Sequence, residues 1–356
     1  MHLPRTLLAT LAFGLAASAS AKPPNLVLIF TDDQGYNDIG CFGSPKIKTP
    51  HLDKMAAEGR KFTSFYSANS VCSPSRASLM TGCYPTRVSI PGVLFPRHDI
   101  GLNPDEITVA EVLKAEGYAT ACIGKWHIGH KPEFLPTRQG FDSYFGIPYS
   151  NDMKIDPAAP LAEDIVLREG YTIETVRGKT EKQHKKNDVP LMRDEEVVEF
   201  PCDQTTLTKR YTEEAVKFIA ANKDKPFFLY LPHTMPHIPL FVPPERAGKS
   251  ERGLYGDVIE EIDHNSGRIL DKVKELGLDD NTYVIFTSDN GPWLLRKDHG
   301  GHALPLRSGK TTCWEGGLRV PCIVRAPGRV PAGSTCDLVT ATIDFLPTFA
   351  SLAGAE

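Results

Sequence analysis

Residues 25–35 read NLVLIFTDDQG, an apolar run that passes directly into two acidic residues and a glycine. Residues 283–291 read YVIFTSDNG and repeat this plan with an acid and an amide. Short apolar runs bounded by turn residues are typical of buried strands in a largely parallel sheet. We therefore expect two buried strands, each of which ends in a pair of oxygen-bearing side chains.

Two further runs, residues 119–123 (ATACI) and 226–231 (PFFLYL), have the same character. Amphipathic helical patterns lie between these runs, and Thr49, Thr108 and Thr212 stand where helix N-caps are expected. Alternating strands and helices predict the α/β class, with a large, mostly parallel but mixed sheet sandwiched between helices.

One segment breaks this alternation. Residues 151–204 are rich in charge and poor in periodicity. We expect them to form an irregular excursion within a single catalytic domain that spans residues 22–356. The excursion is either a solvated surface segment or one rim of a substrate cleft, because it follows candidate site residues directly.

The first 21 residues have the pattern of a signal peptide. His2 and Arg5 give a cationic start, residues 7–17 are apolar, and Ala19 and Ala21 complete a cleavage pattern of small residues. No other segment approaches the length of a transmembrane helix. We therefore expect a periplasmic or secreted protein with no membrane span.

The composition excludes some classes of function. The chain carries 40 basic and 44 acidic residues, a net charge of −4, which leaves no electrostatic footprint for nucleic acid. Its eight cysteines are too sparse for a disulfide-built scaffold, and none forms a C-x-x-C zinc pair. Disulfide connectivity cannot be assigned from the sequence.

Polar side chains gather where the four predicted strands end. In open α/β sheets ligands bind at the carboxyl ends of the strands, so all four ends are expected at one edge. Besides the two pairs quoted above, the strand ends deliver a lysine and several histidines: Lys125, His127, His233 and His237. His233 we interpret as a supporting or core histidine.

A metal ion is the natural partner of the two acidic strand ends. Asp32, Asp33 and Asp289 would repel one another without a cation, and Asn290 adds an amide oxygen. This set of hard oxygen ligands suits calcium better than zinc. Acidic pairs before glycine are also common turn formers, so either motif alone would be weak evidence.

The segment that decides the function is residues 72–82, CSPSRASLMTG. Cys-x-Pro-x-Arg followed by Thr-Gly resembles the signature of the type I, formylglycine-dependent sulfatases of the alkaline phosphatase-like superfamily. The resemblance continues in the same order through residues 31–33, 124–127, 236–239, 288–291 and 309–317. It implies that a smaller antiparallel C-terminal subdomain normally follows, so we expect this chain to be C-terminally truncated.

The resemblance implies a mechanism. A formylglycine-generating enzyme would oxidise Cys72 to formylglycine, whose hydrate offers two hydroxyls on one carbon. One hydroxyl would attack sulfur and expel the alcohol, and deprotonation of the other would then release sulfate. Calcium would be held by Asp32, Asp33, Asp289, Asn290 and the modified Cys72.

The resemblance also implies roles for the remaining candidates. Arg76 should orient the formylglycine hydroxyl, while Lys125 and Lys310 should clamp the sulfate. Ser150 matches a sulfate-contacting serine of arylsulfatase-like members. Cys313 departs from the small or polar residue expected in the Lys310 motif, but Lys310 keeps its place.

Two histidines are assigned proton transfers by the same resemblance. His127 is the candidate base for the formylglycine hydrate. His237, together with Lys310, should protonate and contact the leaving oxygen.

Residues 124–150 look most like the arylsulfatase A and N-acetylgalactosamine-6-sulfatase members, which implies sulfated sugars or aryl sulfates as substrates. Two alternatives remain open. The chain could be a phosphonate or phosphate monoester hydrolase of the same superfamily, or a catalytically silent fragment that binds calcium or carbohydrate.

Overall fold

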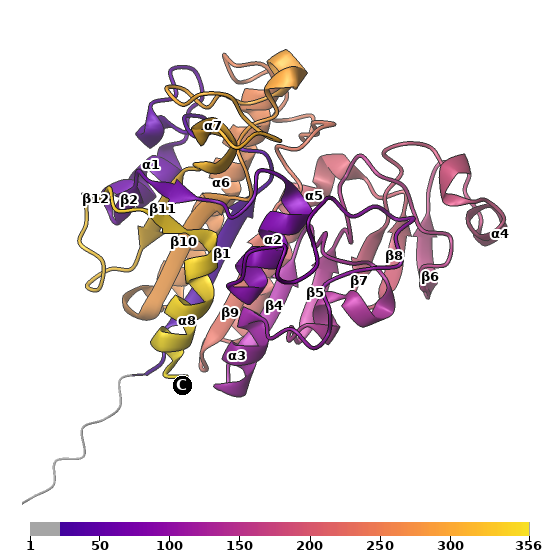
Figure 1. Cartoon of the computed structure of the whole chain (residues 1–356), viewed down its shortest axis with the longest axis horizontal. Helices are drawn as coiled ribbons and strands as arrows, with labels where there is room; N and C mark the ends of the chain where they lie inside the picture. Colours follow the sequence, from indigo (N-terminus) through magenta and orange to yellow (C-terminus); the bar gives the residue numbers. More distant parts are fainter. Residues whose placement is uncertain (1–21, 356) are drawn as a thin grey trace, which may run out of the picture.

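The four apolar runs form the centre of an eleven-stranded sheet in the computed structural model, which describes residues 22–355 (Figure 1). They are β1 (Asn25–Thr31), β4 (Ala119–Ile123), β9 (Phe227–Pro232) and β10 (Thr282–Ser288). These strands run parallel in the order β10-β1-β9-β4. The predicted α/β fold class is therefore confirmed. The predicted signal peptide, residues 1–21, lies outside the described residues.

Shorter strands extend this parallel centre on both sides and make the sheet mixed. Beside β10 the order continues through β11 (Cys322–Arg325), β2 (Arg60–Phe62) and β12 (Ser334–Cys336). Beside β4 it continues through β5 (Ser143–Gly146), β7 (Leu191–Arg193), β8 (Glu196–Phe200) and β6 (Leu161–Leu167). A separate two-stranded sheet pairs β3 (Phe65–Tyr66) with β13 (Thr340–Ala341).

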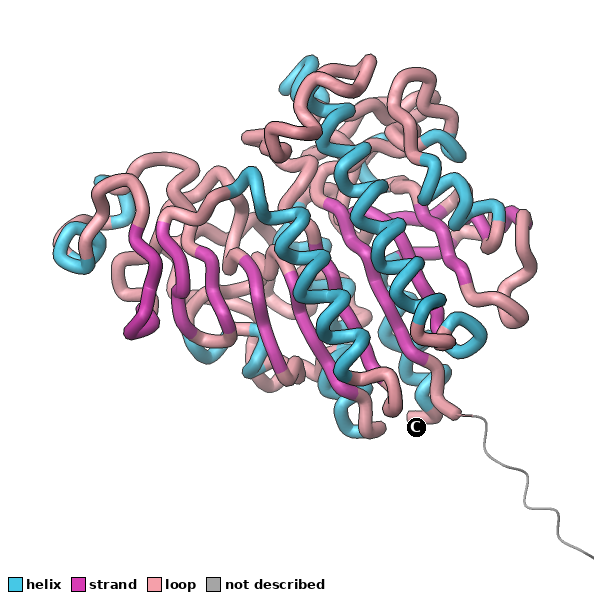
Figure 2. Tube along the Cα trace, turned by 180° about the vertical axis from the view of Figure 1, so that it is seen from behind, coloured by secondary structure: helices cyan, strands magenta, loops and turns pink. Residues whose placement is uncertain are grey.

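Helices cover both faces of the sheet, because alternate residues of the central strands point into two different cores. Val27 and Ile29 of β1 belong to one core, whereas Leu26, Leu28 and Phe30 belong to the other. The first core lies under α1 (Pro50–Ala57), α5 (Leu207–Ala221) and α6 (Leu254–Glu275), the last two of which cross the sheet in Figure 2. The second lies under α2 (Cys72–Thr81), α3 (Val109–Ala115) and α8 (Phe345–Ala353).

Two of the three predicted caps occupy N-cap positions, but only Thr108 caps its helix through its side chain, since the Thr49 hydroxyl accepts no hydrogen bond from α1. Thr49 precedes α1, and Thr108 forms a capping box with Glu111 at the start of α3. Thr212 is not a cap: α5 begins five residues earlier, and the Thr212 hydroxyl donates to the Thr208 carbonyl within the helix. The apolar face of α5 already includes Leu207, so burial extends the helix upstream of the predicted start.

The stretch 151–204 is more regular than the sequence predicts. It supplies β6, β7 and β8, the outer strands of the sheet, together with the short helix α4 (Ile173–Arg177). Its strands escape detection for two reasons: β6 buries only Ala162 among its seven residues, and β7 and β8 are short and interrupted by charged residues. Long-range pairing to β5, not local periodicity, makes this segment extended.

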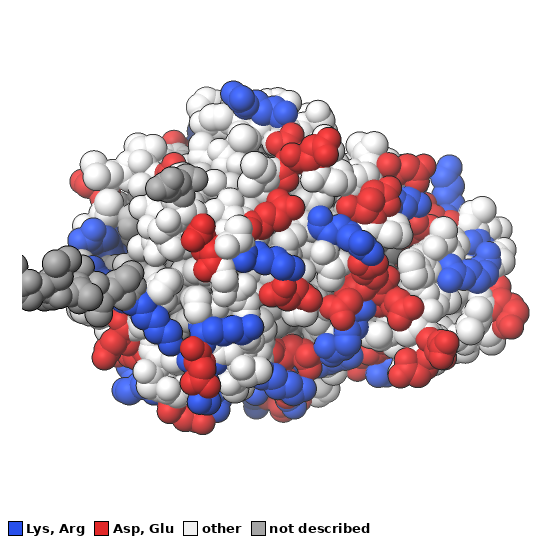
Figure 3. Space-filling view, turned by 90° about the horizontal axis from the view of Figure 1, so that it is seen from below, with Lys and Arg blue, Asp and Glu red and all other residues white. Residues whose placement is uncertain are grey.

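The face opposite the carboxyl ends of the strands carries acidic and basic side chains in close alternation (Figure 3). Exposed pairs of this kind contribute little to stability, since water screens them. Within residues 22–355 no helix is both long and apolar enough to cross a membrane.

Candidate active site

The carboxyl ends of β1 and β10 bring four oxygen-bearing side chains together. Asp32, Asp33, Asp289 and Asn290 are all buried. The Asp33 amide donates to Asp289 Oδ1 at 3.1 Å, and Asn290 Nδ2 donates to Asp33 Oδ1 at 2.7 Å. Asp33 holds a positive φ of 63°, a strained backbone conformation that the contacts across the two strands maintain.

Helix α2 places Cys72 at its first position, with the positive end of the helix dipole beside the acid cluster. All ten residues of α2 are buried, and Cys72 is only 2% exposed. One turn later, Arg76 Nη2 donates to Asp289 Oδ2 at 2.8 Å and Nη1 donates to the Lys125 carbonyl at 2.9 Å. Arg76 therefore ties the helix to two of the predicted strand ends.

A glycine allows Lys125 to enter the site. Gly124 follows β4 with a φ of 134°, and a Cβ at this position would lie 1.9 Å from the Pro232 carbonyl oxygen. The next residue, Lys125, is fully buried and donates from Nζ to Asp32 Oδ2. The same ammonium lies 3.3 Å from Ser150 Oγ, which brings this predicted substrate contact into the cluster.

Lys310 pairs with the second acid of the β1 end. Its Nζ lies 2.6 Å from Asp33 Oδ1 and 2.7 Å from Asp33 Oδ2. Burial is the largest single influence and lowers the pKa of this ammonium, but the surrounding negative groups, Asp33 foremost, together outweigh burial and raise the pKa above its ordinary value. Lys310 therefore stays charged inside the site.

The buried charges form a balanced set of three acids and three bases: Asp32, Asp33, Asp289, Arg76, Lys125 and Lys310. The three bases do not offset the charge of each acid equally. Burial and the neighbouring Asp32 raise the pKa of Asp289 to about 7, even though Arg76 opposes them. Despite the effect of burial, Lys125 and the other cations instead lower the pKa of Asp32. Asp289 is thus the buried acid whose charge the cations compensate least, and a bound cation would stabilise its ionised form.

Two unpaired oxygens test whether a metal ion fits here. Asp32 Oδ1 and Asn290 Oδ1 are buried without any hydrogen-bond partner among the described residues. Ligand atoms of Asp32, Asp33 and His237 lie within 4.8 Å of one another. Buried carboxylate and amide oxygens without donors are costly unless a cation binds them. The residues present therefore fit a hard divalent ion such as calcium.

His127 presents one free ring nitrogen. Its Nε2 lies 2.9 Å from the Leu94 carbonyl oxygen, so this nitrogen carries the proton and donates it. Nδ1 is buried with no partner among the described residues and keeps its lone pair. Burial first, and then the charge of Lys125, hold the pKa of His127 well below its usual value, so the ring is a neutral acceptor.

His237 is oriented by a residue that the sequence analysis missed. Its Nδ1 lies 2.6 Å from the Ile238 carbonyl oxygen and 3.0 Å from Asn151 Oδ1, so Nδ1 donates to these acceptors. Nε2 then faces the acid cluster, 3.7 Å from Asp33 Oδ2. The only signal for Asn151 was its place directly after Ser150, which is too weak to predict a function.

Trp293 is a second residue that was missed. Its ring centroid lies 5.8 Å from that of His237 and 4.7 Å from Lys310 Nζ. It follows the Asn290 strand end by three residues, but its side chain reaches the site only through the folded loop. His233, in contrast, is buried in the core side of the site, with both ring nitrogens unpartnered among the described residues.

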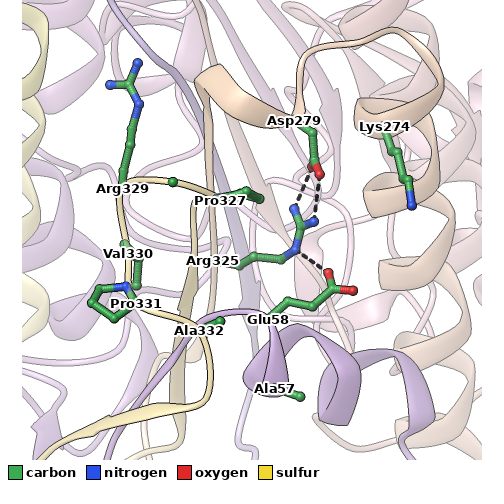
Figure 4. A pocket seen from close by; sticks show the side chains of 11 residues that line it. Ala57, Glu58, Lys274, Asp279, Arg325, Pro327, Arg329, Val330, Pro331 and Ala332 are labelled. Atoms are coloured by element: carbon green, nitrogen blue, oxygen red, sulfur yellow. Dashed lines mark hydrogen bonds and ion pairs between the residues drawn. The ribbon is translucent and has the colours of Figure 1, made fainter.

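A cavity of about 630 Å³ lies at the other end of β10 (Figure 4). Here Arg325 donates through Nη1 and Nη2 to Asp279 and through Nε to Glu58, at 2.6 to 2.8 Å. Each of the three guanidinium nitrogens of this arginine thus donates to a carboxylate. This pocket lacks the unpaired ligand oxygens that mark the carboxyl edge.

Comparison with known proteins places these residues in a family context. Residues 24–355 match the family model described as Sulfatase. Arylsulfatase A of Homo sapiens is 43% identical over 367 residues, a match that spans 100% of this chain and 68% of the human protein. N-acetylgalactosamine-6-sulfatase of Canis lupus familiaris is 39% identical, with 98% of this chain and 66% of that protein covered. The chain thus spans about two thirds of these relatives.

Solved structures agree with the sequence matches. Ps i-CgsB, solved in complex with k-i-k-neocarrahexaose, superposes with a TM-score of 0.80 at 33% identity and covers 94% of this chain and 73% of that one. The PsFucS1 sulfatase from Pseudoalteromonas sp. gives a TM-score of 0.79 at 30% identity, over 94% of this chain and 68% of that one.

Proposed function

The chain belongs to the sulfatase family, and from that premise we propose that it hydrolyses sulfate esters with a formylglycine made from Cys72 and a bound calcium ion. One observation carries the proposal. Cys72 opens a buried helix beside Lys125 and Lys310, at the same edge where Asp32 Oδ1 and Asn290 Oδ1 lack partners. A nucleophile position, two sulfate-binding cations and free metal-ligand oxygens thus coincide.

Calcium would be held by Asp32, Asp33, Asp289, Asn290 and the modified Cys72. When bound, calcium supplies positive charge that polarises the sulfuryl group, and formylglycine supplies a hydroxyl nucleophile that a thiol cannot replace. With calcium bound, the net charge of the site would suit an anionic substrate. The three buried acids and three buried bases cancel, so a divalent ion leaves the site cationic.

Four side chains of the chain itself would position the reacting groups. Arg76 is fixed by Asp289 and the Lys125 carbonyl and would orient the nucleophilic hydroxyl. Lys125 pairs with Asp32 and Lys310 with Asp33, and the two ammonium groups would hold the sulfuryl oxygens, where charge grows in the transition state. Ser150, within 3.3 Å of Lys125 Nζ, would contact the same sulfate group.

Two histidines would move the protons. The free lone pair of His127 Nδ1 is suited to accept a proton from the nucleophile, because Nε2 is already committed to the Leu94 carbonyl. His237 Nε2 faces the cluster. In its imidazolium form, with the Nδ1 proton held by the Ile238 carbonyl, His237 would deliver the proton on Nε2 to the leaving alcohol oxygen, assisted by Lys310, and would return to the neutral ring. Asn151 would keep His237 in this orientation.

The relatives guide the proposed substrate class. One is named N-acetylgalactosamine-6-sulfatase, and Ps i-CgsB was solved with a neocarrahexaose. We propose a sulfated carbohydrate as the natural substrate and aryl sulfates as artificial ones, in a periplasmic or secreted setting. A formylglycine-generating enzyme would act before folding is complete, because the folded chain leaves Cys72 only 2% exposed.

Turnover of p-nitrophenyl sulfate and p-nitrophenyl phosphate tests the reaction class, on protein co-expressed with a formylglycine-generating enzyme. We expect release of p-nitrophenol from the sulfate ester at a much higher kcat/KM than from the phosphate ester. Cys72→Ala should abolish this turnover, while Cys313→Ala, a change at an exposed cysteine, should leave it unchanged. Faster turnover of the phosphate ester would instead favour the phosphonate and phosphate ester hydrolases.

A further inference from the structure

An arginine at the mouth of the site is stacked on Trp293. The guanidinium carbon of Arg296 lies 3.9 Å from the Trp293 ring centroid, a close cation–π contact. The same indole lies 4.7 Å from Lys310 Nζ and 5.8 Å from the His237 ring centroid. One aromatic ring thus contacts both an exposed arginine and two groups that are proposed to act on the scissile sulfate.

The backbone around Trp293 fixes this arrangement to the catalytic edge. The Gly291 amide donates to the Gly317 carbonyl at 3.0 Å, and the Lys310 amide donates to the Pro292 carbonyl at 2.9 Å. The two residues directly before Trp293 are therefore tied to the segment that carries Lys310. On its other side, the Arg296 amide donates to the Trp293 carbonyl at 3.0 Å, which keeps the two stacked residues on one turn.

Arg296 has free donors. Within residues 22–355 no carboxylate or other hydrogen-bond acceptor pairs with its guanidinium, and its side chain is exposed. In contrast, Arg76 and Arg325 use their donors on carboxylates. A guanidinium presents a planar fork of donors that matches carboxylate and sulfate oxygens, and stacking on an indole orients the fork while leaving its edge free.

We propose that Arg296, oriented by Trp293, binds a second anionic group of the substrate beside the sulfate that is cleaved. The inference rests on the proposed function, and it narrows the substrate class to sulfated saccharides with a further sulfate or a carboxylate close to the scissile ester. Lys125 and Lys310 hold the first anion, and Arg296 holds the second. Neutral sugars with a single sulfate lack a partner for this arginine.

The chain offers a matched control on the same loop. Arg307 is stacked on Trp314, with its guanidinium carbon 3.5 Å from the ring centroid. No carboxylate of the described residues pairs with Arg307 either. Trp314 makes no aromatic or cation–π contact with His237 or Lys310, unlike Trp293. Arg307→Ala therefore removes a similar exposed cation whose tryptophan contacts neither His237 nor Lys310.

The test compares kcat/KM for p-nitrophenyl sulfate, a monosulfated neutral disaccharide, and the same disaccharide with a second sulfate or with a uronate. A hydrogen bond to a charged group is worth a factor of roughly ten or more. Arg296→Ala should therefore lower, by about tenfold, the ratio of kcat/KM for the doubly charged saccharide to kcat/KM for the singly charged one. Arg307→Ala should leave this ratio, and the kcat/KM for each saccharide, unchanged. Comparison of the sulfate and uronate probes identifies which second anion is preferred.

Three results would overturn the inference. The ratio could stay the same in Arg296→Ala, it could fall equally in Arg307→Ala, or the wild-type enzyme could show no preference for doubly charged saccharides. A failure of the proposed function itself has a different signature, since the wild-type enzyme would then release no sulfate from any of the probes.

Discussion

Two buried or half-buried arginines lie at opposite ends of β10, and their surroundings differ in a way that separates function from stability. Arg325 at the amino end pairs with Asp279 and Glu58, and its carboxylate partners reach solvent (Figure 4). Arg76 at the carboxyl end is 1% exposed and pairs with the fully buried Asp289. The neighbours of Arg76 include ligand oxygens that no donor satisfies.

This difference marks the proposed catalytic edge better than the number of charged residues at each end does. An arginine with all of its carboxylate partners in place cross-links the fold and leaves nothing for a ligand. A buried acid cluster with unpaired oxygens is costly in the absence of a ligand, so its persistence indicates a binding role. The comparison leads to three predictions, given from the largest expected effect to the smallest.

The largest effect concerns the two arginines themselves. Arg76→Met leaves Asp289 buried without its partner, so it should lower the free energy of unfolding by about 3–5 kcal/mol and remove measurable turnover. Arg325→Met should lower the free energy of unfolding by only about 1 kcal/mol and keep kcat per folded molecule. Urea unfolding and p-nitrophenyl sulfate assays measure both quantities. Equal loss of kcat in the two variants would remove the distinction between the two ends of β10.

An intermediate effect concerns the unpaired oxygens. Calcium at about 100 times its Kd should stabilise the wild-type protein by about 2.7 kcal/mol, because it binds the folded state alone. Asn290→Ala should lose most of this gain. Asn281→Ala is the matched control at the amino end of β10, where Arg329 already occupies the side-chain oxygen. Thermal unfolding with calcium and with chelator gives the comparison, and a loss of the gain in Asn281→Ala would contradict it.

The smallest effect is a pH dependence at the amino end. The hydrogen bond and charge of Arg325 lower the pKa of Asp279, although burial opposes them. A lowered pKa stabilises the fold at any pH above the unfolded value of about 3.9, and this contribution is lost as the pH falls. The stability difference between wild type and Arg325→Met should therefore shrink between pH 6 and pH 3. A difference that stays constant over this range would exclude the linkage.

The strands and their ends were predictable because their signals are local. Continuous apolar runs marked β1, β4, β9 and β10, and the polar residues directly after them had to meet at one edge of a parallel sheet. Motif resemblance then added α2 and Lys310. Each of these inferences needed only neighbouring residues and one rule of topology.

The features that were missed depend on contacts between distant segments. The strands in residues 151–204 form by pairing at the sheet edge. Helix α5 begins five residues before Thr212 because Leu207 is buried in the core. Asn151 acquires its role only when His237 folds against it. Trp293 likewise becomes a wall of the site only when Lys310 returns to the same edge. No local pattern encodes such pairs.

The most direct test of the central claim is peptide mass spectrometry across Cys72, combined with sulfate release by the same preparations. Co-expression with different amounts of a formylglycine-generating enzyme would give samples with different degrees of conversion. We predict that p-nitrophenyl sulfate turnover rises in proportion to the converted fraction, passes through zero for unconverted protein and is lost with chelator. Turnover by protein whose Cys72 remains a thiol would contradict the account.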